Sequence, residues 1–194
     1  APQCGRIELV DIGLAEDPEG EPTSTGGTGA QSPRLYALTD AEIADAWPLP
    51  GPHDDKYTQG VVGVIAGSHR YPGAGILCTG AAVTATSGMT RYVGSAHAAV
   101  VEHFPEVVAV PEFADAGRVQ AWVVGPGAGT DDAATELLGK ILATELPVLV
   151  DADGLTVLSE HPDLVRGRDA PTLLTPHAGE FARLTGEEVG ADRL

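Results

Sequence analysis

From residue 61 onward, the chain alternates between short apolar runs and longer stretches in which apolar residues recur three and four positions apart. The apolar runs are punctuated by Gly, Pro or Asp, and they are continuous rather than alternating with polar residues. Such runs are typical of strands that are buried on both faces of a sheet. The pattern therefore predicts a mostly parallel sheet with helices on both faces, which is a three-layer α/β fold. The predicted strands are residues 61–66, 107–110, 119–124, 147–150 and 172–174.

Two stretches carry signals for the start of a helix. Thr39 followed by Glu42 forms a capping-box pattern, which predicts a short helix that ends near Pro48. Residues 131–145 form a longer amphipathic pattern, and Thr130 is the expected N-cap of that helix. Its predicted apolar face consists of Ala134, Leu137, Leu138, Ile141 and Leu142.

The amino-terminal part of the chain has a different character. Residues 7–12 resemble a short strand for which the sequence offers no local partner. Residues 16–34 contain no apolar side chain larger than Ala and are rich in Pro, Gly, Ser, Thr and Glu. This composition is typical of a linker. The α/β unit is therefore expected to follow the linker.

Composition and charge narrow the class of protein. The apolar fraction is 43%, as in globular domains, and two cysteines, Cys4 and Cys78, are too few for a disulfide framework. A formal net charge of −17 disfavours binding of nucleic acid through its phosphates. No run of about 18 apolar residues and no basic leader segment is present. We therefore expect a soluble, cytoplasmic protein with no membrane or nucleic-acid partner.

Four loops are expected at the carboxyl ends of the predicted strands, where open α/β sheets bind their ligands. Glycine-rich sequence occupies residues 67–75 and 125–130. Residues 151–154 contribute two carboxylates, and residues 175–180 contribute an imidazole and a carboxylate. Backbone amides at the start of a helix can hold phosphate without lysines. The four loops therefore predict a cleft for a polar, phosphate-bearing small molecule.

The glycine and aspartate motifs also have structural interpretations when each is taken alone. The spacing of Gly125, Gly127 and Gly129 differs from the dinucleotide-binding fingerprint, no Walker sequence occurs, and strand-to-helix turns need Gly in any case. Asp151 and Asp153 could act as acid, base or magnesium ligand, or as ordinary turn and N-cap residues.

His177 and Glu180 lie three residues apart across a turn into a helix. They could form half of a zinc site, but no third ligand stands at a metal-binding spacing, so hydrogen bonding by His177 is favoured over metal binding. No G-x-S-x-G sequence occurs, which leaves hydrolase chemistry of that kind without support.

Taken together and in this order, the loops resemble the NAD(P)H-hydrate dehydratase family. The resemblance covers roughly residues 53–186 and implies a ribokinase-like fold. The matching sequences are HDDKYTQGVVGVIAGS at 53–68, YPGA at 71–74, VGPG at 124–127, VDADGL at 150–155, LTPHAGEF at 174–181 and LTG at 184–186.

The resemblance implies the repair of a damaged cofactor. The implied substrate is hydrated NADH or NADPH, in which water has added across a ring double bond. ADP or ATP, with Mg²⁺, is the implied driver of water removal. Hydroxide is a poor leaving group, so transfer of a phosphoryl group to the hydroxyl followed by loss of phosphate restores the dihydronicotinamide.

The resemblance also implies which residues form the site. Three roles are implied: contact with the hydrated dinucleotide, shaping of the same pocket, and a basic position near the entrance. Contact with the dinucleotide is implied for Ala74, Gly127 and His177, and shaping of the pocket for Gly73, Gly125 and Glu180. The basic position is Lys56, and Asp151 and Asp153 are further candidates.

The chain departs from the family pattern at its carboxyl end. The catalytic base of the family is an Asp in a Gly-Gly-x-Gly-Asp loop, which is expected beyond Leu194, so no catalytic residue and no metal ligand is assigned here. The glycines at 26–29 are no substitute, because they lie in the linker. The 194 residues alone are therefore expected to be inactive. Smaller departures are the two Asp before Lys56 and the Ser-Gly-Met sequence at 87–89.

The resemblance divides the chain into three parts. Residues 1–14 resemble the end of an NAD(P)H-hydrate epimerase domain, residues 15–52 form a linker with a short helix, and residues 53–194 form the amino-terminal part of a dehydratase domain. We expect a segment of a bifunctional enzyme that is compatible with a homo-oligomer and exposes an edge strand and apolar faces. Another ribokinase-like small-molecule kinase and a non-catalytic remnant are the alternatives.

Overall fold

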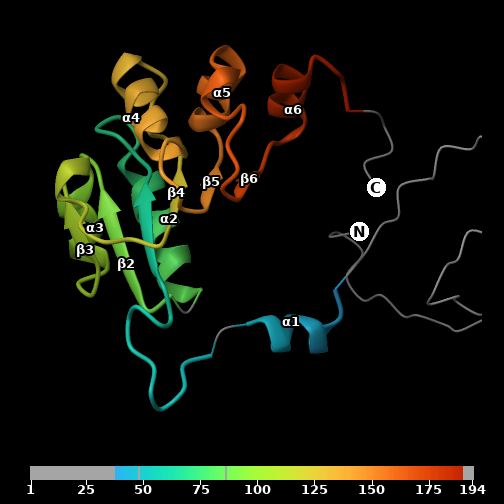
Figure 1. Ribbon diagram of the computed structural model, residues 1–194. Coiled ribbons are helices and arrows are strands. Elements are labelled where there is room, and N and C mark those ends of the chain that lie inside the picture. The colour runs from blue at the N-terminus through green and yellow to red at the C-terminus, as the bar shows by residue number, and fades with distance from the viewer. Residues whose placement is uncertain (1–37, 48, 86, 190–194) are drawn as a thin grey trace, which may run out of the picture. The chain divides into compact units, whose positions relative to one another are not determined.

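The computed structural model describes residues 38–47, 49–85 and 87–189 (Figure 1). The expected strand at residues 7–12 and the linker at 16–34 lie outside the described residues. Within them, helix α1 (Asp40–Ala46) begins with the predicted capping box. The Thr39 hydroxyl accepts a hydrogen bond from the Glu42 N–H at 3.3 Å, and the Glu42 carboxylate accepts one from the Thr39 N–H at 2.7 Å.

Parallel strands form one sheet in the described part of the chain. The strands are β1 (Val61–Ile65), β2 (Met89–Val93), β3 (Val108–Val110), β4 (Ala121–Val124), β5 (Val148–Val150) and β6 (Thr172–Leu174). Their order is β3-β2-β1-β4-β5-β6, and every neighbouring pair is parallel. The carboxyl ends of all these strands therefore share one edge of the sheet, as the apolar runs predict.

Helices pack on both faces of the sheet, which confirms the predicted three-layer α/β fold. They are α2 (Pro72–Thr84), α3 (His97–His103), α4 (Asp132–Leu142), α5 (Asp153–Glu160) and α6 (Ala178–Thr185), with 3-10 turns at Phe113–Asp115 and Pro162–Leu164. Helices α2 and α3 contact each other and the strands β1 to β3. Helices α4, α5 and α6 are neighbours (Figure 1), and α5 contacts the other two.

The two faces of the sheet bury separate apolar clusters. Strand β1 contributes to both, because successive side chains of a strand point to opposite faces. Val61 and Ile65 belong to the cluster that includes Leu138 of α4 and Leu155 of α5. Val64 belongs to the other cluster, in which partly buried residues of α2 also pack. Each helical layer is therefore held to the sheet by its own core.

Strand β2 is absent from the sequence prediction, because polar residues interrupt its apolar pattern. Its sequence is MTRYV, and polar groups of Arg91 and Tyr92 find partners inside the fold, although the buried Nε of Arg91 has none among the described residues. The hydroxyl of the fully buried Tyr92 donates to the Ala66 carbonyl at 2.7 Å, and the Arg91 guanidinium donates to the Ala116 carbonyl at 3.0 Å. Burial raises the pKa of the Tyr92 hydroxyl, which keeps it protonated as a donor. These bonds allow a polar strand to lie inside the sheet.

Helix α4 begins one residue later than the sequence predicts. The N-cap is Asp131, whose carboxylate accepts a hydrogen bond from the Ala134 N–H at 2.9 Å. The expectation that Thr130 caps this helix is wrong, because the Asp131 carboxylate takes the N–H bond and also favours the positive end of the helix dipole. The predicted apolar face is confirmed by the burial of Leu138, Ile141 and Leu142.

An apolar hollow of about 330 Å³ lies on the face of β4, β5 and β6 that is turned away from the larger core. It is lined by side chains that alternate along these strands with the buried ones. Strand β6 forms an edge of the described sheet, and Leu173 is 58% exposed there. Apolar surface and a strand edge are thus exposed together. The side chains that line the hollow include Val62, Ala121, Val123, Leu149 and Leu173.

The substitution Gly63→Ala is expected to destabilise the fold. A methyl group at Gly63 would lie 2.4 Å from Cε3 of Trp122, whose buried indole packs against Phe113 with ring centroids 5.4 Å apart. Overpacking of this kind costs about 1–3 kcal/mol in the free energy of unfolding. Urea unfolding measures the difference.

Gly139→Ala is the matched control for this substitution. A methyl group there meets Leu164 at 3.4 Å, an ordinary contact, and Ala is favoured over Gly inside a helix by roughly 0.5–1 kcal/mol. The two variants should therefore shift the urea midpoint in opposite directions. A midpoint for Gly63→Ala at or above that of the wild type would show that the indole yields freely.

Candidate active site at the carboxyl ends of the strands

The loops that follow β1 and β4 are joined through their backbones. The N–H of Gly67 donates to the carbonyl of Pro126 at 2.7 Å, and the N–H of Gly125 donates to the carbonyl of Ile65 at 3.0 Å. Gly67 has a φ of +74°, and a Cβ there would lie 2.7 Å from the nitrogen of Gly75. Both the conformation and the close approach therefore require glycine at this position.

Ala74 and Gly127, two of the residues assigned to the site from the sequence, lie next to each other. A Cβ on Gly127 would be 2.9 Å from the Cβ of Ala74 and 3.2 Å from that of Tyr71. Gly73 lies in the first turn of α2, and a Cβ there would meet no other atom within 4 Å. The first turn of α2 and the loop after β4 therefore form a surface with small side chains and accessible backbone.

The loop after β5 reaches the same place. A Cβ on Gly125 would lie 1.9 Å from the carbonyl oxygen of Asp151, so the two loops touch backbone to backbone. The Gly154 N–H donates to that carbonyl at 3.0 Å and closes a tight turn. Ala152, inside this turn, has φ of 49° and ψ of −117°. Such a conformation costs on the order of 1–3 kcal/mol in a residue other than Gly, and it persists only where the surrounding structure holds it.

The two carboxylates of this loop face different partners. Asp153 begins α5, and its Oδ2 accepts a hydrogen bond from the Gly129 N–H at 2.9 Å, which ties the loops after β4 and β5 together. Asp151 acts on Cys78 of α2: burial and then the negative charge of Asp151 raise the pKa of that thiol. A thiol with a raised pKa stays protonated near neutral pH, so Cys78 is not an activated nucleophile.

His177 and Glu180 form a reciprocal cap at the start of α6. Nδ1 of His177 accepts hydrogen bonds from the N–H groups of Gly179 at 3.0 Å and Glu180 at 3.3 Å. The carboxylate of Glu180, which is 8% exposed, accepts a bond from the His177 N–H at 2.9 Å. The two residues therefore support each other through the polar contacts of a capping box.

The hydrogen bonds of His177 also assign the tautomer of its ring. Because Nδ1 accepts two backbone N–H groups, the proton of the neutral imidazole lies on Nε2. Nε2 is 3.4 Å from Oε1 of Glu180, and the side chain of His177 is 70% exposed. The ring therefore presents an N–H donor at the surface beside the end of β6.

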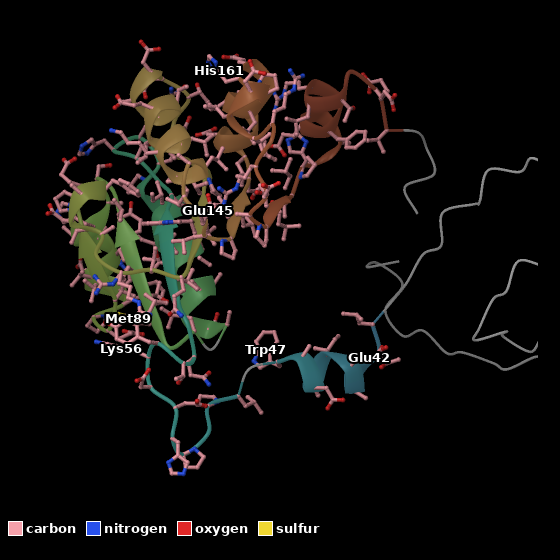
Figure 2. All side chains as sticks on the ribbon, in the orientation of Figure 1. Glu42, Trp47, Lys56, Met89, Glu145 and His161 are labelled. Carbon is pink, nitrogen blue, oxygen red and sulfur yellow. The ribbon has the colours of Figure 1, made fainter. Side chains whose placement is uncertain are left out.

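The candidate residues that follow a strand come to one edge of the sheet. Gly73, Ala74, Gly125, Gly127, Asp151, Asp153, His177 and Glu180 all follow the carboxyl end of a strand. Lys56 does not join them, because it precedes β1. Its backbone carbonyl approaches Gly88, just before β2, and Figure 2 shows Lys56 and Met89 at the same end of the sheet. The structure therefore separates Lys56 from the loops that the other residues occupy.

A cavity of about 380 Å³ opens at the same edge, beside α4. Of the residues assigned from the sequence, Gly125 lines it, whereas Ala74, Gly127 and His177 do not. Sequence reasoning missed Ser95 and Glu112, which line the cavity after β2 and β3. The Gly94-Ser95 pair would have been a signal for a site loop if β2 had been recognised as a strand.

Neither a metal-binding cluster nor a membrane-spanning helix is present among the described residues. Residues 38–47, 49–85 and 87–189 contain no group of three or more His, Cys, Asp or Glu side chains arranged to hold a metal ion. In the same ranges, no helix has the length and apolar character needed to cross a membrane.

Solved structures share this fold. The chain superposes on a ribokinase-like superfamily protein of Enterococcus faecalis with a TM-score of 0.69 and 23% identity, over 80% of this chain and 60% of that one. It also matches the ADP/ATP-dependent NAD(P)H-hydrate dehydratase of Bacillus subtilis, co-crystallised with ATP and Mg²⁺, with a TM-score of 0.64 and 25% identity, over 76% of this chain and 55% of that one.

Sequence relatives point to one family. The chain is 62% identical over 191 residues to the bifunctional NAD(P)H-hydrate repair enzyme Nnr of Mycobacterium tuberculosis, covering 98% of this chain and 37% of the relative. It is 37% identical over 146 residues to the ATP-dependent (S)-NAD(P)H-hydrate dehydratase of Ixodes scapularis, covering 70% of this chain and 48% of that protein. The chain thus spans less than half the length of either relative. A family model described as NAD(P)H-hydrate dehydratase matches residues 62–194, most of the chain, which therefore belongs to the NAD(P)H-hydrate dehydratase family.

Proposed function

We propose that the protein containing this chain removes water from hydrated NADH or NADPH in a reaction driven by ADP or ATP. The observation that carries the proposal is the convergence of the loops after β1, β4 and β5 on the edge where β6 places His177. The names of the relatives, a repair enzyme for NAD(P)H-hydrate and an ATP-dependent dehydratase, support it.

In this proposal, the substrate lies on the surface formed by Ala74 and Gly127. Neither residue has a side chain beyond a methyl group, so a dinucleotide can approach the backbone closely. The N–H of Gly73 lies in the first turn of α2, where helical N–H groups have no intrahelical acceptor and attract phosphate. Gly125 shapes the same surface, because a side chain there would collide with Asp151.

His177 supplies a hydrogen-bond donor to the substrate. Its Nδ1 is committed to the cap of α6, which fixes the ring and leaves the proton on Nε2. The buried carboxylate of Glu180 accepts a hydrogen bond from the backbone N–H of His177 and so fixes that backbone. The pair therefore holds the Nε2–H at a fixed place beside the end of β6, and in this proposal Glu180 acts as a positioning residue.

We assign neither the phosphoryl donor nor the metal to a group that this structure describes. When bound, ADP or ATP supplies the phosphoryl group that turns the hydroxyl of the substrate into a good leaving group. No cluster of described side chains fits Mg²⁺. We therefore assign binding and orientation of the hydrated cofactor to this chain, and we assign no step of phosphoryl transfer to its residues.

The proposal predicts turnover of hydrated NADH by the protein that contains this chain. With ADP or ATP and Mg²⁺, the near-ultraviolet absorbance of the dihydronicotinamide should return, and without a nucleotide it should not. A control reaction offers small alcohols in place of the hydrated cofactor. Phosphorylation of an alcohol with no recovery of NADH would contradict the proposal and favour a ribokinase-like kinase.

Two substitutions of His177 separate its cap from its contact with substrate. Asn is a good N-cap, so His177→Asn should unfold like the wild type, whereas His177→Ala should lose about 0.5–2 kcal/mol of stability. Both remove the Nε2–H donor and should raise KM for the hydrated cofactor by roughly threefold to tenfold, the worth of one hydrogen bond. Steady-state kinetics and urea unfolding measure the two effects. If His177→Asn has the same KM as the wild type, the role of His177 is limited to capping α6.

Asp153 is expected to act as a positioning residue through its bond to the Gly129 N–H. Asp153→Ala should lower kcat/KM by on the order of tenfold, because the loop after β4 loses a partly buried hydrogen bond. Asp153→Asn keeps an acceptor oxygen and should restore most of the activity. Asp132→Ala is the control, since Asp132 holds the same first position in α4. Equal kinetics for Asp153→Ala and Asp132→Ala would remove Asp153 from the site.

A further inference from the structure

The cavity beside α4 is formed by loops from four neighbouring strands. Its walls come from the ends of β1, β2, β3 and β4 and from the first turns of α4. A volume of about 380 Å³ lies at the low end of the range for small-molecule sites, which runs from roughly 300 to 1,000 Å³. The space therefore suits one ring with its substituents rather than a whole dinucleotide.

The lining of the cavity consists of buried or partly buried apolar side chains, which we call its floor, and of polar and glycine positions that are mostly partly exposed, which we call its rim. The apolar side chains are Val93, Phe113, Leu137, Leu138 and Val157. Glycines line the rim, so a ligand there can reach backbone N–H and carbonyl groups directly. The rim residues with polar or no side chains are Gly67, Ser68, Gly94, Ser95, Glu112, Gly125 and Gly129.

The charges around the cavity favour a ligand that donates hydrogen bonds over one that carries phosphate. Lys140 is the one cation among the described lining residues, and its Nζ pairs with Oε1 of Glu136 at 2.7 Å. Glu112 adds an exposed carboxylate. An ionised carboxylate accepts hydrogen bonds and repels anions, so an amide or amino group suits this rim.

The cavity adjoins the surface assigned to the substrate. Gly67 and Gly125 belong to both, and the N–H of Gly67 is bonded to the carbonyl of Pro126, next to Gly127. A dinucleotide seated on Ala74 and Gly127 can therefore extend one end into the cavity.

We propose that the cavity beside α4 receives one ring end of the hydrated dinucleotide, a ring that bears an amide or amino group. The proposal rests on the proposed function, because it takes the same substrate. Two parts of the substrate have this chemistry: the hydrated nicotinamide, with its carboxamide, and the adenine, with its exocyclic amine. Glu112 and Ser95 accept the N–H groups of the ring, and its faces lie against the apolar floor.

The test fills the cavity and measures binding to the protein that contains this chain. Ser95→Leu fills it from the β2 loop, Ala134→Leu fills it from α4, and Ala98→Leu on α3, which does not line it, is the matched control. The probes for calorimetry are reduced nicotinamide mononucleotide and ADP-ribose, which carry one ring end each. Urea unfolding identifies any variant that fails to fold. If one filling variant fails to fold, the binding measured with the other filling variant decides the test.

We expect both filling variants to weaken the binding of one probe by at least tenfold and to change the binding of the other by less than twofold. Ala98→Leu should change the binding of either probe by less than twofold. Loss of the nicotinamide probe places the reacting ring in the cavity, and loss of ADP-ribose places the adenine there. Glu112→Gln should weaken the same probe by roughly threefold to tenfold, with Glu102→Gln as control. Unchanged binding of both probes to the filled variants would overturn the proposal.

Turnover of hydrated NADH distinguishes this failure from failure of the proposed function. If the wild type turns over hydrated NADH, and the filled variants bind both probes and turn over the substrate as the wild type does, only the cavity assignment is overturned. Absence of turnover by the wild type, together with selective loss of one probe in the filled variants, would overturn the dehydratase function and keep the ring site.

Discussion

The contact between backbones at the tips of β1, β4 and β5 is the constraint on which the site depends. Gly67 bonds to Pro126, and Gly125 lies so close to Asp151 that a single methyl group would not fit between them. The parallel pairing of the strands brings these tips to one edge, and the glycines let them touch. Any side chain at these points would separate the loops and open the surface on which Ala74 and Gly127 meet.

In the proposed function a strongly acidic chain holds an anionic cofactor, and the same constraint explains how. With a formal net charge of −17, the protein offers few lysines or arginines to phosphate. The loops offer backbone N–H groups instead, and carboxylates of these loops accept hydrogen bonds from the backbone of the protein. Asp153 binds the Gly129 N–H and Glu180 binds the His177 N–H, so two negative charges near the site are satisfied by the protein itself.

Much of the fold could be predicted from the sequence, because β1, β4, β5 and β6 are nearly continuous apolar runs. Strand β2 could not, since Arg91 and Tyr92 gain their partners only from tertiary structure: the Ala116 carbonyl 25 residues away and the Ala66 carbonyl 26 residues away. That omission also hid Ser95, which follows β2 and lines the cavity, whereas Glu112 follows the predicted strand at 107–110 and carries no motif that would single it out. The loops of the site were recognisable as motifs. Lys56 precedes β1 and therefore lies at the amino ends of the strands, and its role near the entrance stays a prediction.

The contact between Gly63 and Trp122 links two positions that lie far apart in the chain and side by side in the sheet. The indole occupies the space that a side chain on this central strand would need. Room for a methyl group at position 63 therefore has to come from a smaller ring at position 122 or from a displaced indole. The width of one aromatic side chain on β4 thus sets the size of residue that its neighbour on β1 can carry.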